Sequence, residues 1–260
     1  MQVHPRSAVN LERGKIMITP KEIANRTMSP EKRAVAHNDY FAFYIGRPLS
    51  YVLTIPFLYT SLSPNIISLL SIVPLIVSFI LFYVASSKVI LVIGWLLFFL
   101  WNLMDGVDGN VARYKKQFSK MGSVYDAMSG YLAMVFTFFS IGMSASHFHG
   151  VLDNFVNIDK SLYIVLGALS GIFMIFPRLV MHKSISALMD ASVVQNVKDK
   201  EHFSQVKVIA LNLSSVTGGA QVLMLVAILF NIMDAYTICY FLFNLLVMLV
   251  SLRSVLKEKK

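Results

Sequence analysis

Three aspartates, Asp105, Asp108 and Asp126, lie close together in the sequence between long apolar stretches. Ionised groups at membrane depth are costly and usually serve a function. Asp105 and Asp108 would share one face of a helix, because residues three positions apart are neighbours on a helix surface. A helical hairpin through the short basic stretch 114–120 would bring Asp126 opposite that face. Oxygen ligands without a nearby His or Cys favour Mg²⁺, Mn²⁺ or Ca²⁺ over zinc, so we predict a divalent-cation site here.

Small residues and an arginine accompany these carboxylates. Gly109, Ala112 and Gly122 add little bulk, which would let a ligand or a neighbouring helix approach the backbone closely. Arg113 offers a planar guanidinium that matches a phosphate group with two parallel hydrogen bonds. A metal site, small residues and an arginine together predict a pocket for a diphosphate.

The spacing of these residues, D-x2-D-G-x2-A-R-x8-G-x3-D, resembles the signature of the CDP-alcohol phosphotransferases, also called CDP-alcohol phosphatidyltransferases. The similarity extends less specifically over most of the chain from Arg47 onward. Members of that family are integral membrane enzymes with six helices and are commonly homodimers. With a divalent metal they move a phospho-alcohol group from a CDP-linked donor to an acceptor hydroxyl and release CMP. The resemblance therefore implies a transferase in phospholipid or related phosphodiester biosynthesis.

The resemblance also implies roles for individual residues. Asp105, Asp108 and Asp126 would hold Mg²⁺ or Mn²⁺ and form the catalytic centre. The CDP moiety would contact the remaining motif residues, which are Gly109, Ala112, Arg113 and Gly122.

One position departs from the family pattern. The family has a fourth aspartate four residues after the third, and this sequence has Gly130 there. In the family, that carboxylate is associated with a second metal and with deprotonation of the acceptor hydroxyl. Here the proton would pass to a metal-bound hydroxide, to Asp126 itself or to a carboxylate from another segment, unless the acceptor is already anionic. The sequence leaves these alternatives open.

A second basic group lies near the end of the predicted fourth span. Arg178 follows Pro177, and His182 and Lys183 come about one helical turn later. These three side chains would hold a phosphate or sugar phosphate on the acceptor. Basic side chains at the end of a span also extend toward lipid headgroups, and this role explains the three residues equally well.

The composition indicates an all-α polytopic membrane protein. Of the 260 residues, 56% are hydrophobic and only 14% are charged, far from the composition of a soluble protein. Six apolar stretches are long enough to cross about 30 Å of hydrocarbon. They cover residues 65–85, 89–113, 121–145, 162–182, 208–230 and 235–252. We therefore predict a six-helix membrane domain in residues 61–260, preceded by a leader and an interfacial segment in residues 1–60.

The placement of charge predicts the orientation. With both termini on one side of the membrane, the basic residues gather on that side, and only Lys88 and Lys160 lie opposite. By the positive-inside rule that side is cytoplasmic, so the aspartates would face cytoplasmic nucleotides, in our interpretation from the inner membrane of a prokaryote. The net charge of +9 follows from this bias and favours contact with anionic membrane lipids. We expect no nucleic-acid binding, because the basic residues do not form one patch.

The leader contains its own structural signals. Residues 19–22, Thr-Pro-Lys-Glu, are typical of a helix start. Residues 40–59 are aromatic and interrupted by Gly and Pro, which favours an interfacial amphipathic segment over a seventh span. Arg47 would lie at headgroup level there, and anchoring to lipid phosphate is favoured over contact with an acidic substrate.

Two other classes of function compete with a transferase. A cation transporter also uses intramembrane carboxylates, but it places them near the midplane, often on broken helices of repeated halves. Here the aspartates lie at one end of the spans, and the sequence shows no repeat. A catalytically silent family member that binds nucleotide and metal, or that acts as a scaffold in a membrane pathway, is the stronger alternative because of Gly130. The intact metal and arginine positions favour the transferase.

Overall fold

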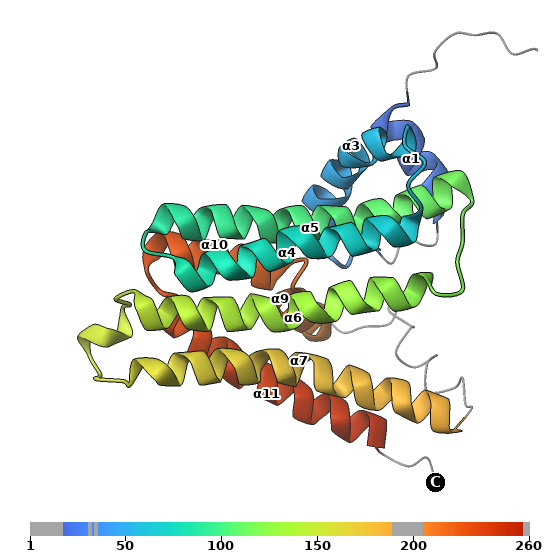
Figure 1. Ribbon diagram of the computed structural model, residues 1–260. Coiled ribbons are helices and arrows are strands. Elements are labelled where there is room, and N and C mark those ends of the chain that lie inside the picture. The colour runs from blue at the N-terminus through green and yellow to red at the C-terminus, as the bar shows by residue number, and fades with distance from the viewer. Residues whose placement is uncertain (1–17, 31–32, 34–35, 189–204, 257–260) are drawn as a thin grey trace, which may run out of the picture.

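The computed structural model describes the chain except for residues 1–17, 31–32, 34–35, 189–204 and 257–260 (Figure 1). The described part contains helices and no strand, which confirms the predicted all-α class. Five uninterrupted helices in it are long and apolar enough to cross a membrane. They are α4 (Pro64–Val84), α5 (Lys88–Lys115), α6 (Gly122–His147), α7 (Lys160–Leu188) and α11 (Met233–Leu256).

The predicted span at residues 208–230 is broken into two helices. α9 (Gln205–Ser214) and α10 (Gly219–Phe230) meet at an angle of 55°, so six crossings result only if this bent pair is one span. The break needs glycine: a Cβ added to Gly219 would lie 2.6 Å from the carbonyl oxygen of Asn212. Apolar composition predicted the position of this span, and the structure adds the bend within it.

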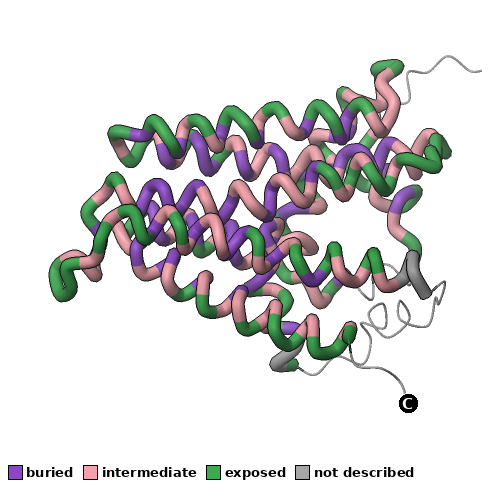
Figure 2. Tube along the Cα trace, turned by 60° about the horizontal axis from the view of Figure 1, so that its bottom comes forward, coloured by how far each residue is buried: buried purple, intermediate pink, exposed green. Residues whose placement is uncertain are grey.

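The helices form an antiparallel bundle in which α5 ends and α6 begins at the same end (Figure 1). We call this the signature end, because it carries the motif residues. Buried residues line the inner faces of the bundle (Figure 2), and the largest include Trp101, Phe82 and Phe138. The outer faces carry exposed Leu, Ile, Val and Phe side chains, as expected for helices in lipid.

The leader packs against the signature end. α1 (Pro20–Thr27) begins as predicted, since the Thr19 side chain accepts a hydrogen bond of 3.2 Å from the backbone N–H of Glu22. A turn of π-helix, η1 (Ala42–Gly46), leads into α3 (Arg47–Leu58). α3 lies across the bundle end at an angle to α4 and α5 rather than alongside them (Figure 1). Its buried polar residues, Ser50 and Thr54, face α5.

α6 and α7 approach each other through glycine. A Cβ added to Gly142 would lie 2.5 Å from the carbonyl oxygen of Tyr163 and 3.0 Å from the Cα atom of Gly167. We expect Gly142→Ala to lower the free energy of unfolding by about 1–3 kcal/mol, because the two backbones must separate. Thermal unfolding of the purified protein in detergent measures this change.

Gly130→Ala is the matched control on the same helix, because a Cβ added to Gly130 would meet no atom of a described residue within 4 Å. It should leave the unfolding temperature unchanged or raise it slightly, since alanine favours the helix. Equal melting of Gly142→Ala and Gly130→Ala would contradict the close approach.

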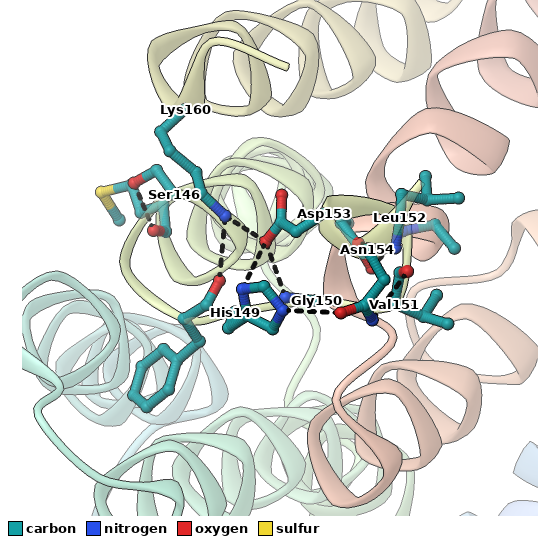
Figure 3. A network of polar contacts seen from close by, with 12 residues as sticks. Ser146, His149, Gly150, Val151, Leu152, Asp153, Asn154 and Lys160 are labelled. Carbon is teal, nitrogen blue, oxygen red and sulfur yellow. Dashed lines mark hydrogen bonds and ion pairs between the residues drawn. The ribbon is translucent and has the colours of Figure 1, made fainter. Parts of the chain in front are cut away.

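The loop at the other end of the bundle is closed by its own polar contacts (Figure 3). The Asp153 carboxylate, in η2 (Leu152–Asn154), accepts hydrogen bonds from Lys160 Nζ and, at 2.8 Å, from the backbone N–H of Gly150. Asp234 at the start of α11 accepts a hydrogen bond of 2.6 Å from the backbone N–H of Leu152. These bonds connect the α6–α7 loop to α11. The carboxylates of Asp153 and Asp234 thus serve to hold the loop in place.

Candidate functional site

The predicted aspartates come from two helices at the signature end. Asp105 and Asp108 lie in the last turns of α5, and Asp126 lies in the first turns of α6. Asp108 is buried, and its carboxylate accepts hydrogen bonds from the Ser68 hydroxyl on α4 and from the backbone N–H of Gly109. Asp126 is exposed. Hydrogen bonds therefore hold the Asp108 carboxylate in place, whereas Asp126 lies at the surface.

A buried hydrogen-bond cluster sets how α6 is rotated against α4 and α5. The Ser71 and Ser129 hydroxyl oxygens lie 2.9 Å apart, and the Trp101 indole N–H donates to the Ser129 hydroxyl at 2.8 Å. The three residues come from three different helices. Buried polar groups need such partners, so this cluster fixes the helix faces that form the site. The sequence analysis missed it, because an isolated Ser in an apolar span carries no motif.

The three carboxylates lie near one another and near Arg113, whose guanidinium is close enough for its charge to act on Asp108 and Asp126. The charges of Asp108 and Asp126 are close enough to act on Asp105. None of the three forms an ion pair within the described residues. In the same part of the chain, no three His, Cys, Asp or Glu side chains are close enough to hold a metal ion as they stand. The donor set suits a divalent cation in its chemistry, and a shared cation would draw these side chains closer together.

A cavity of about 190 Å³ opens beside Asp105. It lies between α3, α5 and the break in the fifth span, and the leader contributes to it through Asp39. Its polar lining includes Arg47, Ser50, Tyr51, Asn102, Asn110, Arg113 and Thr217. Of the predicted site residues, the structure thus brings Asp105 and Arg113 into one cavity.

Two arginines line this cavity with unused donors. The Nε atoms of Arg47 and Arg113 are buried, and neither has a hydrogen-bond partner among the described residues. The two guanidinium groups are close enough for their charges to repel. Buried N–H groups and paired positive charges both favour an anion with more than one negative charge. Arg47 therefore belongs to the cavity, where the sequence analysis had favoured a lipid contact.

Gly109 makes room for Arg113 rather than directly for a ligand. A Cβ added to Gly109 would lie 2.9–3.3 Å from the guanidinium atoms of Arg113. The Nη2 atom of Arg113 donates to the side-chain oxygen of Asn110 at 3.2 Å, and Asn110 in turn donates to Thr54 of α3 at 3.1 Å. The last turns of α5 are thereby tied to α3, and the guanidinium is held over its own helix.

The other small motif residues have different surroundings. The Ala112 carbonyl accepts a hydrogen bond of 2.9 Å from the backbone N–H of Gln117, which closes the end of α5. A Cβ added to Gly122 would lie 3.7 Å from the side-chain oxygen of Asn65, an ordinary contact. The protein alone thus does not require glycine at position 122, so a steric need there would come from a ligand.

Asn102 links the cavity to the broken span. Its side-chain amide donates to the Gln221 side-chain oxygen at 2.7 Å and to the Thr217 carbonyl oxygen at 3.0 Å. The Trp95 indole N–H also reaches this region and donates to the Gln221 carbonyl oxygen at 2.7 Å. The irregular backbone at the break therefore forms part of the cavity wall, which sequence periodicity did not indicate.

The predicted acceptor residues lie on another side of the site. Arg178, His182 and Lys183 occupy α7 and do not line the cavity beside Asp105. The Nδ1 atom of His182 lies 3.2 Å from the Tyr131 hydroxyl on α6. All three side chains are exposed. The structure separates them from the arginine pair and keeps them at the signature end.

Comparison with known proteins agrees with the motif. The model of the CDP-alcohol phosphatidyltransferase family matches residues 61–252, which include α4 to α10, most of α11 and every motif residue. No curated protein matches the sequence. Because the match covers most of the chain, and because the motif residues gather at one end of a helical membrane bundle, the protein belongs to the CDP-alcohol phosphatidyltransferase family.

Proposed function

We propose that this protein transfers a phospho-alcohol group from a CDP-linked donor to an acceptor hydroxyl and releases CMP. Its family supports phosphotransfer from CDP-alcohols by an integral membrane enzyme. The observation that carries the proposal is the cavity next to Asp105, in which two arginines have buried Nε–H groups without a hydrogen-bond partner in the described part of the chain. A nucleoside diphosphate supplies the several negative charges and phosphate oxygens that such a cavity would bind.

In this mechanism each group of residues has one task. Asp105, Asp108 and Asp126 would hold Mg²⁺ or Mn²⁺, for which oxygen-only ligands are suited. When bound, such a cation neutralises charge on the bridging and leaving phosphate oxygens. Arg47 and Arg113 would orient the diphosphate through their guanidinium forks. A hydroxyl approaching from the far side would then attack phosphorus in line with the departing CMP oxygen.

The acceptor would come from the α7 side. Arg178 and Lys183 would attract an anionic acceptor, since both are exposed cations at the signature end. His182 lies between them in sequence and would share this region. A free phosphate group or a phosphorylated sugar on the acceptor fits this chemistry.

The proposal extends to orientation and assembly. The excess of Lys and Arg at the signature end supports a cytoplasmic site with both termini on that side, and the family resemblance supports a homodimer. Reporter fusions at each terminus test the orientation, and light scattering of the detergent complex tests the assembly.

Release of CMP tests the function directly. The purified protein in lipid nanodiscs should release CMP from a panel of CDP-alcohols when an acceptor and Mg²⁺ or Mn²⁺ are present, and EDTA should stop the reaction. A protein that binds CDP with metal but never releases CMP across a broad acceptor panel would instead be the silent family member that Gly130 suggests.

A further inference from the structure

Three consecutive residues of α6 point in three different directions. Ser129 contacts α4 and α5 through its hydrogen bonds, and Tyr131 contacts α7 through His182. Successive residues of a helix are about 100° apart around its axis, so position 130 faces a direction between these two contacts. Among the residues that the structure describes, no atom lies within 4 Å of a Cβ added to Gly130. The helix therefore presents an open space at this position, bounded on one side by α7.

This space adjoins the carboxylate of Asp126. Asp126 precedes Gly130 by four residues and shares its helix face. The contacts of Gly142 with Gly167 and of Gly171 with Val135 show that α6 and α7 are antiparallel, so the last turns of α7 lie beside the first turns of α6. The hydrogen bond between Tyr131 and His182 confirms this register at the signature end. Asp126, the open space and His182 thus belong to one region.

His182 has the geometry of a proton acceptor. When Nδ1 carries its hydrogen and donates to the Tyr131 oxygen, 3.2 Å away, Nε2 carries a lone pair that can accept a proton. A second partner on the imidazole also fixes the ring's orientation and tautomer. The other described histidines are less suited: the ring of His37 lies against that of Phe43 in the leader, with their centroids 3.9 Å apart, and His147 and His149 lie at the opposite end of the bundle.

We infer that His182, oriented by Tyr131, accepts the proton of the acceptor hydroxyl in the space beside Gly130; this inference rests on the proposed function. As the hydroxyl oxygen forms its bond to phosphorus, its proton passes to Nε2. The bond between phosphorus and the CMP oxygen breaks, and CMP leaves with that electron pair. The imidazolium then returns the proton to solvent. His182 contacts the acceptor and is a catalytic residue, whereas Tyr131 is a positioning residue.

The test uses CMP release by the full-length protein with a CDP-alcohol and acceptor on which the wild type is active. His182→Ala should lower kcat by about 100-fold or more while CDP affinity, measured by calorimetry, stays unchanged. Added imidazole should restore part of this activity. Tyr131→Phe should lower kcat by up to about tenfold with little change in KM, because one hydrogen bond to the ring is lost.

A double variant separates a chemical role from a structural one. Gly130→Asp supplies a carboxylate one residue before Tyr131, the partner of His182, so Gly130→Asp with His182→Ala should recover at least about tenfold over His182→Ala alone. His149→Ala is the matched control, since the His149 ring also contacts polar side chains, those of Asn154 and Asp153, but lies in the opposite loop (Figure 3), and it should keep wild-type kcat.

The outcomes distinguish the two proposals. If the wild type releases CMP and His182→Ala keeps kcat within about threefold, the role of His182 is wrong and the transferase stands. If His182→Ala loses activity that neither imidazole nor Gly130→Asp restores, His182 acts through structure and the inference is also wrong. A wild type without any CMP release overturns the transferase and the inference together.

Discussion

Asp126→Asn should lower CMP release by at least about 100-fold. The substitution keeps the shape of the side chain and removes one negative charge from the group that would hold the divalent cation. Stabilisation of phosphate charge by a metal amounts to several kcal/mol, and each 1.36 kcal/mol changes a rate about tenfold. Asp126 is exposed, so the variant should fold normally. Initial rates at saturating donor, together with metal-dependent CDP binding by calorimetry, measure the effect.

Asp159→Asn is the control for this experiment. Asp159 is an exposed carboxylate at the opposite end, where its side chain accepts hydrogen bonds from the backbone and hydroxyl of Ser161. Asparagine serves this role equally well, so turnover should remain at the wild-type level. If Asp126→Asn also kept wild-type turnover and metal dependence, Asp126 would not belong to the metal site.

Arg113→Lys should weaken CDP binding by roughly 10–100-fold. The lysine keeps the charge but loses both the Nε–H group, which is buried without a described partner, and the planar fork. A hydrogen bond to a charged group contributes about 1.5–3 kcal/mol. Calorimetry with CDP and Mg²⁺ measures the change, and gel filtration establishes that the variant is folded.

Two further variants isolate the placement of this guanidinium. Gly109→Ala puts a methyl group where the Arg113 guanidinium now lies, so it should weaken CDP binding without changing any charge. Arg26→Lys is the control, because Arg26 pairs with Glu22 on α1 and stays outside the cavity. Wild-type CDP affinity in both Arg113→Lys and Gly109→Ala would reassign the diphosphate to another surface.

Sequence patterns that depend on residues close together in the chain predicted the local features of the fold well. Continuous apolar stretches predicted the ends of the long helices to within six residues, because a membrane span needs a fixed length of apolar side chains. The Thr19 cap predicted the start of α1, since a cap is set by residues only three positions apart. The motif itself depends on the 3.6-residue period of a helix and on one short loop between α5 and α6.

Features that depend on contacts between distant residues were decided only by the tertiary structure. The break at residues 215–218 depends on the close approach of Gly219 to Asn212, and apolar composition alone cannot distinguish it from a continuous helix. Arg47 reaches the cavity because α3 packs on α5, with Asn110 bonding to Thr54. A sequence pattern reports the period of one helix but not which helix packs against it.

The same division holds at the centre of the site. The spacing of three aspartates and an arginine follows helix geometry, and it was enough to predict that they gather at one end of the bundle. The direction in which each helix face turns depends on the packing of the helices against one another. The contact of Ser129 with α4 and α5, and that of Tyr131 with α7, aim Gly130 into open space. Those contacts join residues far apart in the chain, and the rotation of a helix is fixed by its neighbours rather than by its own sequence.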